Sequence, residues 1–185
     1  MNTTHIPVVL GTAREGRASE GVAKAIVALI AKMEGCTTEL VDVRDYVTSA
    51  TTTPPWGAGG ADETSSPWQV VVQKSAGFVL VIPEYNHSFP GELKLLLDSL
   101  TSDYEGKVVG LVGVSVGTLG GARVLEHILP VLHTLSLKAV KESVLITKVN
   151  EAVGESGAFS DPKTAAYTEK MVEAMQSLAA KLATE

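Results

Sequence analysis

Five short apolar runs alternate along the chain with longer segments whose apolar residues recur at helical spacing, and this alternation constrains the fold most. Runs such as GFVLVI (77–82) lack the polar residues of a half-exposed strand and are typical of strands buried in a parallel sheet. The predicted strands are Ile6–Leu10, Glu39–Val43, Gly77–Ile82, Lys107–Val114 and Leu137–Ile146. The predicted helices are Ser19–Lys32, Pro67–Ser75, Gly91–Leu100, Gly120–Leu132 and Pro162–Ala183.

Capping and breaking residues set the expected helix ends. We expect Ser19 to be the N-cap of the first helix and Gly35 to end that helix. We expect Asp161 to be the N-cap of the last helix. We expect Pro130 to end or bend its helix. The stretch Arg44–Ser66 is rich in Thr, Pro and Gly and predicts a long loop, and loops of this length are usually functional or mobile.

Strands that alternate with helices imply an α/β sandwich of three layers, with a parallel sheet covered on both faces. Five strands in this order fit the flavodoxin-like arrangement 2-1-3-4-5, in which ligands bind at the carboxyl ends of the strands, between strands 1 and 3. The loops expected to form a site are therefore Gly11–Ser19, Pro83–Pro90 and Ser115–Gly121. A chain of 185 residues suits a single domain, 1–185.

Composition excludes several classes of protein. The chain is 45% hydrophobic, which is typical of a globular protein. Its formal net charge of −6 argues against a nucleic-acid partner, because an acidic chain gains nothing from releasing phosphate counterions. No apolar run approaches a membrane span, no basic segment precedes an apolar one as in a signal peptide, and the lone Cys36 suits a reducing compartment. We expect a soluble cytoplasmic protein without a membrane partner.

The first loop, GTAREGRAS (11–19), nearly matches the phosphate-binding P-loop pattern. Arg17 stands where that pattern has lysine, and Ala18 replaces the hydroxyl that binds Mg²⁺, so a nucleotide hydrolase is the least favoured interpretation. The hydroxyls of Thr12 and Ser19, the guanidiniums of Arg14 and Arg17, and the N-terminus of the following helix instead favour a terminal phosphate monoester. The alternative is a surface turn whose arginines are solvated.

The second loop, PEYNHSFPG (83–91), places Tyr85 or His87 against a flat ring, or is an ordinary turn shaped by Asn86. The third, SVGTLGG (115–121), has glycines that let the backbone approach a ligand edge. Residues 113–117 also match the G-x-S-x-G nucleophile elbow, but Glu126 and His127 are helical neighbours that cannot face each other, so no triad is predicted. The four histidines lack metal-ligand spacing, and no metal site is predicted.

Together, GTAREGRAS, PEYNHSFPGELKLLLDSL (83–100) and SVGTLGGARV (115–124) resemble the NADPH-dependent FMN reductase family in order and separation, over nearly the whole chain. Thr12 stands where many members carry serine. The resemblance implies bound FMN, NADPH or NADH as electron donor, and an acceptor such as free flavin, a quinone, an azo dye or a metal oxyanion. It also implies a homodimer or homotetramer with the flavin near a subunit interface.

The resemblance also assigns the residues of the site. The phosphate would be held by Thr12, Arg14, Arg17, Ala18 and Ser19. The isoalloxazine would lie along Pro83, Glu84, Tyr85, Asn86 and His87, and its pyrimidine edge would meet Ser115, Val116, Gly117 and Thr118. A flavin carries its own redox chemistry, so no catalytic acid–base residue is predicted, and a ping-pong mechanism is expected. The alternatives are an FMN-binding electron carrier without NAD(P)H chemistry, and an interaction protein that keeps the fold without FMN.

Overall fold

A computed structural model describes residues 3–52 and 66–184. Its centre is a five-stranded parallel sheet in the order β4-β2-β5-β6-β7. The strands are β2 (Val8–Leu10), β4 (Leu40–Asp42), β5 (Gly77–Pro83), β6 (Val108–Val114) and β7 (Lys138–Ile146). Numbered along the chain, these five strands follow 2-1-3-4-5, which confirms the predicted order.

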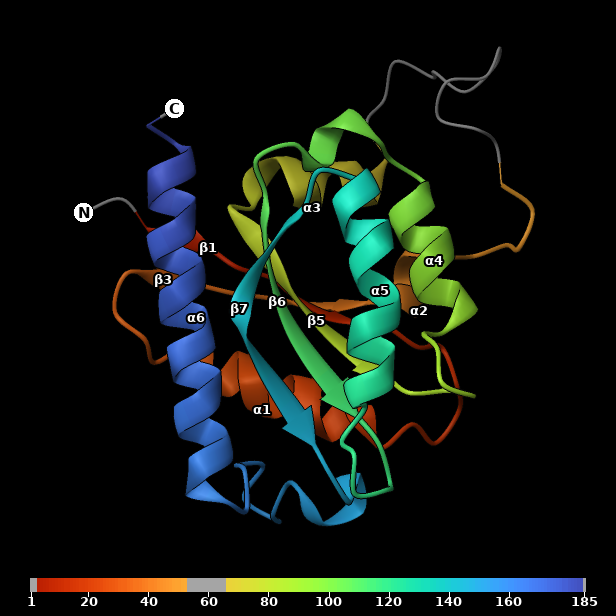
Figure 1. The fold of residues 1–185 in the computed structure, drawn as a ribbon, viewed down its shortest axis with the longest axis vertical. Coiled ribbons are helices and arrows are strands. Elements are labelled where there is room, and N and C mark those ends of the chain that lie inside the picture. The colour runs from red at the N-terminus through yellow and green to blue at the C-terminus, as the bar shows by residue number, and fades with distance from the viewer. Residues whose placement is uncertain (1–2, 53–65, 185) are drawn as a thin grey trace.

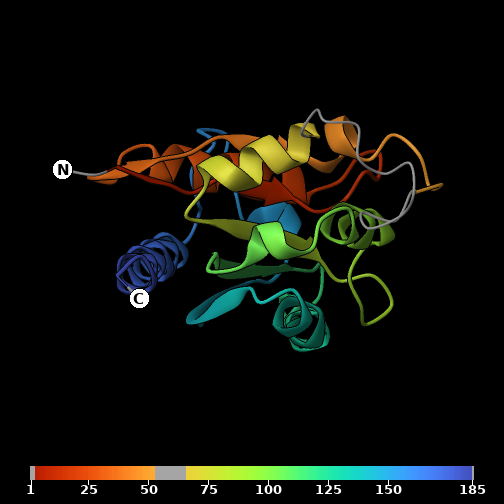
Figure 2. The ribbon, with the colours of Figure 1, turned by 90° about the horizontal axis from the view of Figure 1, so that it is seen from above.

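Helices cover both faces of this sheet and complete the predicted three layers (Figures 1 and 2). Two of them, α1 (Ser19–Ile30) and α6 (Pro162–Leu182), share an apolar core with one face. The opposite face packs against α3 (Pro67–Lys74), α4 (Gly91–Asp98) and α5 (Ala122–Thr134). Two turns of 3-10 helix, η1 (Ser102–Tyr104) and η2 (Val149–Glu151), follow α4 and β7. No helix among residues 3–52 and 66–184 is long and apolar enough to cross a membrane.

The first two predicted strands are shorter in the structure, and a short additional strand precedes each of them. A short parallel pair, β1 (Thr4–His5) and β3 (Cys36–Thr37), precedes β2 and β4. Pro7 separates β1 from β2 because it has no N–H to donate to the ladder. The backbone nonetheless stays in register, since Ile6 N donates to Thr37 O and Val8 N to Glu39 O, both at 2.8 Å.

The predicted loop after the second strand begins with a helical turn, α2 (Val43–Tyr46), because the carboxylate of Asp42 accepts a hydrogen bond from Arg44 N. Residues 53–65 of the predicted loop lie outside the described residues.

Helix ends agree with the predicted caps in part. Asp161 accepts a hydrogen bond from Lys163 N at 2.9 Å and caps α6 as expected. Ser19, by contrast, does not cap α1: the N-cap is Ala18, and Ser19 is the first helical residue. Pro130 does not end α5, which continues to Thr134, because Pro130 lies on the exposed side where water can satisfy the carbonyl one turn earlier.

Candidate functional site

Three loops meet at the carboxyl ends of the parallel strands and line a cavity of about 310 Å³. Figure 1 shows that the arrowheads of β6 and β7 point toward the edge where α5 begins. The first loop contributes Arg14, Gly16, Arg17, Ala18 and Ser19 to the lining. The second contributes Pro83, Glu84 and Tyr85, and the end of β6 with the third loop contributes Val114, Ser115 and Val116. The predicted loops therefore do come together.

Some predicted residues lie outside this lining, and four lining residues were not predicted, namely Gly16, Val114, Val149 and Asn150. Thr12, Asn86, His87, Gly117 and Thr118 belong to the same three loops but do not line the cavity itself. Val149 and Asn150, in η2, complete the wall. Their position directly after the fifth strand is the sequence signal that could have indicated them, because that strand also ends at this edge of the sheet.

The N-terminus of α1 presents an unpartnered hydroxyl to the cavity. Ser19 is only 3% exposed, and its Oγ atom has no hydrogen-bond partner. A buried hydroxyl without a partner is costly unless a ligand satisfies it. The first-turn N–H groups of a helix also carry partial positive charge. This combination suits an anionic oxygen.

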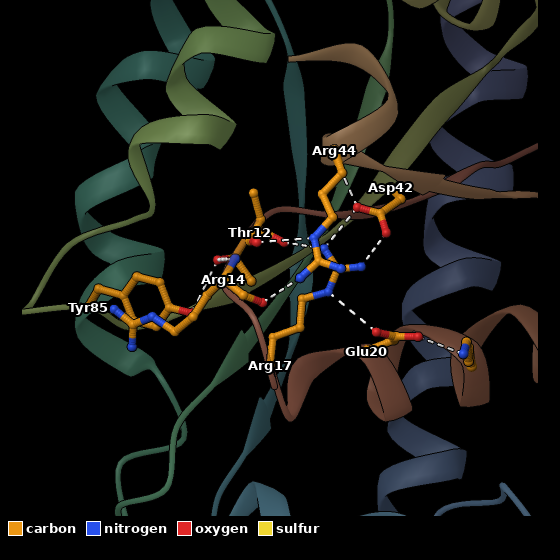
Figure 3. Close-up of polar contacts among 9 residues, drawn as sticks. Thr12, Arg14, Arg17, Glu20, Asp42, Arg44 and Tyr85 are labelled. Carbon is orange, nitrogen blue, oxygen red and sulfur yellow. Dashed lines mark hydrogen bonds and ion pairs between the residues drawn. The ribbon is translucent and has the colours of Figure 1, made fainter. Parts of the chain in front are cut away.

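Tyr85 joins the first two loops. Its hydroxyl is 3.1 Å from Thr12 Oγ1, which also accepts a hydrogen bond from Arg14 N at 3.2 Å. The guanidinium carbon of Arg14 lies 3.6 Å from the centre of the Tyr85 ring, a cation–π contact visible in Figure 3. Arg14 thereby lies at the wall of the cavity that Ser19 also lines.

The Arg17 side chain follows a different course (Figure 3). Its guanidinium makes a two-pronged contact with the carboxylate of Asp42, donates from Nη1 to the Thr12 carbonyl, and lies 3.5 Å from Glu20 Oε2 through Nε. The bond to Asp42 raises the pKa of Arg17. For Asp42, burial raises the pKa, but the bonds from Arg17 and from Arg44 N outweigh burial and lower it. The guanidinium expected on the phosphate is thus engaged by protein acceptors.

The second loop is a tight hairpin. Tyr85 and Ser88 exchange two backbone hydrogen bonds of 2.9 and 3.0 Å, and Asn86 and His87 between them have φ angles of 50° and 68°. Two successive left-handed residues are the signature of a type I′ turn, which asparagine tolerates well and histidine less well. Asn86 does therefore shape the turn, and the turn brings Tyr85 to the cavity.

Glu84 adds a second unpartnered polar atom to the wall. Its Oε1 accepts a hydrogen bond from Arg123 Nη1, at the start of α5, at 3.2 Å, whereas Oε2 is buried without a partner. Its backbone N donates to Val114 O at 2.9 Å, so this residue also ties the second loop to the end of β6. A ligand that donates a hydrogen bond would satisfy the Oε2 atom.

Two glycines hold the third loop against the sheet. Gly121 has a φ of +83°, and a Cβ added there would lie 2.6 Å from Val114 N. A Cβ on Gly113 would lie 2.7 Å from Gly120 O. The loop is also fastened to the chain after β7, since Val149 N donates to Ser115 O at 3.1 Å. The glycines therefore allow close packing of the backbone, and the part of the loop that lines the cavity is Ser115 and Val116.

With this geometry established, comparison with known proteins identifies the family. The sequence profile of the NADPH-dependent FMN reductase family matches residues 4–151. The chain belongs to this family. The resemblance inferred from the three loops is therefore confirmed.

Individual relatives in the family match only part of this chain. An NAD(P)H-dependent FMN reductase of Schizosaccharomyces pombe is 31% identical over 133 residues, which cover 68% of this chain and 66% of that protein. A quinone reductase of Escherichia coli is 33% identical over 93 residues, covering 45% and 50% of the two chains. The chain thus spans between half and two thirds of the length of these curated relatives.

Solved structures confirm the flavodoxin-like fold. The flavoenzyme NAD(P)H:(acceptor) oxidoreductase FerB from Paracoccus denitrificans superposes with a TM-score of 0.80 at 22% identity, covering 97% of this chain and 98% of that one. A flavodoxin mutant from Pseudomonas aeruginosa superposes with a TM-score of 0.56 at 15% identity, covering 91% of this chain and 99% of that one. At such identities the likeness concerns the fold alone.

Proposed function

We propose that this member of the family is an FMN-dependent NAD(P)H oxidoreductase that passes two electrons to a small acceptor, such as free flavin, a quinone, an azo dye or a metal oxyanion. Family membership supports the flavin and the nicotinamide donor. The observation that carries the proposal is the cavity at the ends of the strands, where the buried Ser19 hydroxyl has no partner at the N-terminus of α1. A ligand with an anionic group would satisfy that hydroxyl.

The residues present fit FMN at both ends of the molecule. A phosphate monoester would satisfy Ser19 Oγ and meet the charge of Arg14 together with the backbone of the loop around Thr12 and Ala18. A ring N–H or a ribityl hydroxyl would donate a hydrogen bond to Glu84 Oε2, the other buried polar atom of the wall without a partner. The cavity volume of about 310 Å³ lies at the lower end of the usual range for small-molecule sites, roughly 300–1,000 Å³.

The chain's own task is to bind and orient the cofactor. We assign the ring to the wall formed by Pro83, Glu84 and Tyr85, with Asn86 and His87 at its outer end. We assign the pyrimidine edge to the segment Ser115–Thr118, whose backbone is fixed by the glycines behind it. FMN supplies hydride acceptance and donation when bound. Fixed backbone donors in a crevice that excludes water favour negative charge on such a ring.

One face of the ring must stay open for both substrates in turn. We therefore propose a ping-pong order, in which oxidised NAD(P)⁺ leaves before the acceptor binds. Initial rates measured with both substrates varied should give parallel lines in a double-reciprocal plot. Intersecting lines would contradict this order while leaving the rest of the proposal standing.

The visible spectrum of the purified protein tests the proposal directly. We expect a yellow protein, or one that turns yellow on incubation with FMN, whose flavin absorbance is bleached by NADPH or NADH under anaerobic conditions. Adding a quinone should then restore the absorbance. A colourless protein that cannot be loaded with FMN would overturn the proposal and favour an FMN-free interaction protein.

The second candidate is an FMN-binding electron carrier, which would hold FMN in the same cavity through the same unpartnered Ser19 hydroxyl. Such a carrier has no need for a nicotinamide to stack on the ring. Flavin that is bleached by dithionite but by neither NADPH nor NADH would favour the carrier over the reductase.

We further propose that the protein forms a homodimer or homotetramer with the site near the subunit interface. Three exposed apolar side chains beside the cavity support this assembly. Val116 and Leu119, in the third loop, are 74% and 47% exposed, and Leu145, on β7, is 46% exposed. Gly120, next to Leu119 in the chain, lies against Leu145, so the loop and the strand are neighbours, and we assign the three side chains to one surface, named here the loop-3 surface.

A further inference from the structure

We propose that Asp42 and Arg44, at the end of β4, hold the phosphate loop (residues 11–19) in its binding conformation. Arg17 acts with them as a positioning residue and does not contact the phosphate through its side chain. This inference rests on the proposed binding of FMN, because it assigns roles around the phosphate of that cofactor. The three residues are named here the outer clamp.

Guanidinium groups of the outer clamp bind three consecutive carbonyls of the loop. Arg17 Nη1 donates to Thr12 O, Arg44 Nε donates to Ala13 O at 3.0 Å, and Arg44 Nη2 donates to Arg14 O at 2.8 Å. Figure 3 shows both guanidiniums gathered beside Asp42. These charge-assisted hydrogen bonds hold three successive peptide groups, so the loop backbone has little freedom to rotate any of these carbonyls toward the cavity.

This arrangement suits the binding of an anion. A carbonyl that faced the site would repel a phosphate, and a trans peptide places its N–H opposite its carbonyl. With the carbonyls of Thr12 and Arg14 held by the clamp, the N–H groups of Ala13 and Glu15 face the other side of the loop. Asp42 and Arg44 are not among the described residues that line the cavity, so these two residues act from outside it, whereas Arg17 lies at its wall.

Asp42 organises both arginines. Its two carboxylate oxygens receive the guanidinium of Arg17, and Oδ1 also accepts a hydrogen bond from Arg44 N at 3.0 Å. The Arg17 side chain is only 3% exposed, so without the carboxylate a buried cation would lose its counter-charge. Asp42 ends a strand of the main sheet, and the clamp therefore anchors the loop to a rigid element.

The donors of Arg17 are already directed at protein acceptors. Each of its three guanidinium nitrogens lies against an oxygen of Thr12, Glu20 or Asp42. Only one N–H of Nη2 lies outside these contacts, and a phosphate bound through any other donor would require the guanidinium to leave its partners. The cavity instead retains the Arg14 guanidinium, the Ser19 hydroxyl and the N-terminus of α1 for the phosphate.

The experiment compares FMN with riboflavin, which lacks the phosphate. Dissociation constants are measured by fluorescence titration for the wild-type protein and for Asp42→Asn, Arg44→Ala and Arg17→Lys. We expect each variant to weaken FMN by about tenfold or more, since charge-assisted bonds hold the loop, and to change riboflavin affinity by less than about threefold. Asp98→Asn, which removes a carboxylate from an exposed ion pair with Lys94 on α4, is the matched control and should change neither constant.

Asp42→Asn could fail to fold, because it leaves the buried Arg17 without its counter-charge. Arg44→Ala avoids this problem, because Arg44 is exposed and its loss leaves no buried side chain without a partner. Unchanged FMN affinity in Arg44→Ala and Asp42→Asn, or equal weakening of FMN and riboflavin, would overturn the outer clamp alone. A wild-type protein that bound riboflavin as tightly as FMN would also overturn it. A wild-type protein that bound neither flavin would instead overturn the proposed function, and the clamp with it.

Discussion

Arg14 and Arg17 are three residues apart in one loop, yet their environments differ sharply. Arg14 is exposed and rests on the Tyr85 ring, whereas the Arg17 side chain is buried against Asp42. A cation that is weakly held by protein can turn to a ligand at little cost, and one with a buried carboxylate partner cannot. The two arginines therefore contribute to the same site in different ways.

Replacing Arg14 with alanine should weaken FMN directly. A hydrogen bond to a charged group contributes about 1.5–3 kcal/mol, so the dissociation constant should rise by roughly ten- to a hundredfold. Riboflavin should bind as before, because it has no phosphate for Arg14 to meet. Lys32→Ala, which removes an exposed cation beyond the end of α1, serves as the control. An FMN constant that did not change in Arg14→Ala would contradict the assignment of Arg14 to the phosphate.

The pKa of Asp42 predicts how stability depends on pH. Burial raises this pKa, but the bonds from Arg17 and Arg44 N hold it below its ordinary value of 3.8. A carboxyl whose pKa is lower in the folded state stabilises the protein above its ordinary value, and this contribution is lost as pH falls through the folded value. The free energy of unfolding should therefore fall below pH 3.8 more steeply in wild type than in Asp42→Asn. Parallel curves for the two proteins between about pH 2 and 4 would argue against this pair as a source of stability.

Motifs could predict which loops form the site but not which way each side chain turns. Loop composition and strand order together place Arg14, Ser19, Glu84 and Ser115 at one edge of the sheet, and the structure brings them together. The direction of the Arg17 side chain depends on Asp42, which is 25 residues away in the sequence. Such long-range pairing has no local signal, because a charged residue at the end of a strand usually faces solvent.

At the scale of the element, the third loop depends on glycine. Replacing Gly121 with alanine introduces a Cβ at a left-handed residue and pushes it against the backbone of β6. The free energy of unfolding should fall by at least about 2 kcal/mol, as is typical of a strained left-handed residue with a collision. FMN and riboflavin should both bind less tightly, because this loop meets the ring and not the phosphate.

Gly91→Ala is the matched control for this substitution. Gly91 begins α4, and a Cβ added there has no neighbour within 4 Å. Its stability, measured by urea unfolding, should stay within about 0.5 kcal/mol of wild type or rise slightly. Equal losses in Gly91→Ala and Gly121→Ala would contradict the role given to backbone contact.

Pro130 lies inside α5, where it has no N–H to donate to the carbonyl of Glu126. Pro130→Ala should therefore stabilise the protein. A proline inside a helix costs about 3 kcal/mol relative to alanine, and up to about 1 kcal/mol is returned because proline restricts the unfolded chain, so the net gain should be about 2 kcal/mol. Urea unfolding measures this gain. A loss of stability would show that α5 is shaped to need the proline, through a bend that alanine does not reproduce.

Whether a segment is a helix or a strand could be predicted, because the spacing of its apolar residues reflects which of them are buried. The ends of helices and strands could be predicted less well. The buried runs at 77–82 and 107–114 correspond closely to β5 and β6, since both faces of a central parallel strand exclude polar residues. The first predicted strand begins at Ile6, but β2 begins only after Pro7, and Pro130 does not end its helix. Both outcomes depend on whether the missing N–H faces the ladder or the solvent, which only the packed structure decides.

At the scale of the whole molecule, the two apolar cores fix the sheet and leave the site on its edge. The strands end together at that edge, and the loops that follow them carry both the cavity and the loop-3 surface. The order of the strands could be predicted, because parallel crossovers of one hand leave few arrangements. The exposed apolar residues could not be distinguished from buried ones in the sequence, since Leu145 lies between the buried Val144 and Ile146, and Leu119 lies in a glycine-rich loop without apolar periodicity.

The loop-3 surface predicts an assembly larger than one chain. Three exposed apolar side chains gathered beside a ligand site are typical of a subunit contact, and their burial favours association by about 25 cal/mol for each Å² removed from water. Leu119→Glu would place a charge in that contact and leave the folded chain intact, because Leu119 is already 47% exposed. Sedimentation velocity should show a dimer or tetramer for wild type and a 19.4 kDa monomer for the variant.

Ala28→Glu introduces the same charge on the exposed side of α1, across the sheet from α5, and should leave the assembly as it is in wild type. The two variants together separate a specific contact from a general effect of added negative charge on an acidic chain. If Leu119→Glu remained a dimer or tetramer, subunits would meet on another face, and the loop-3 surface would then be free to border the opening through which donor and acceptor reach the cavity. A monomeric wild type would instead contradict the assembly itself.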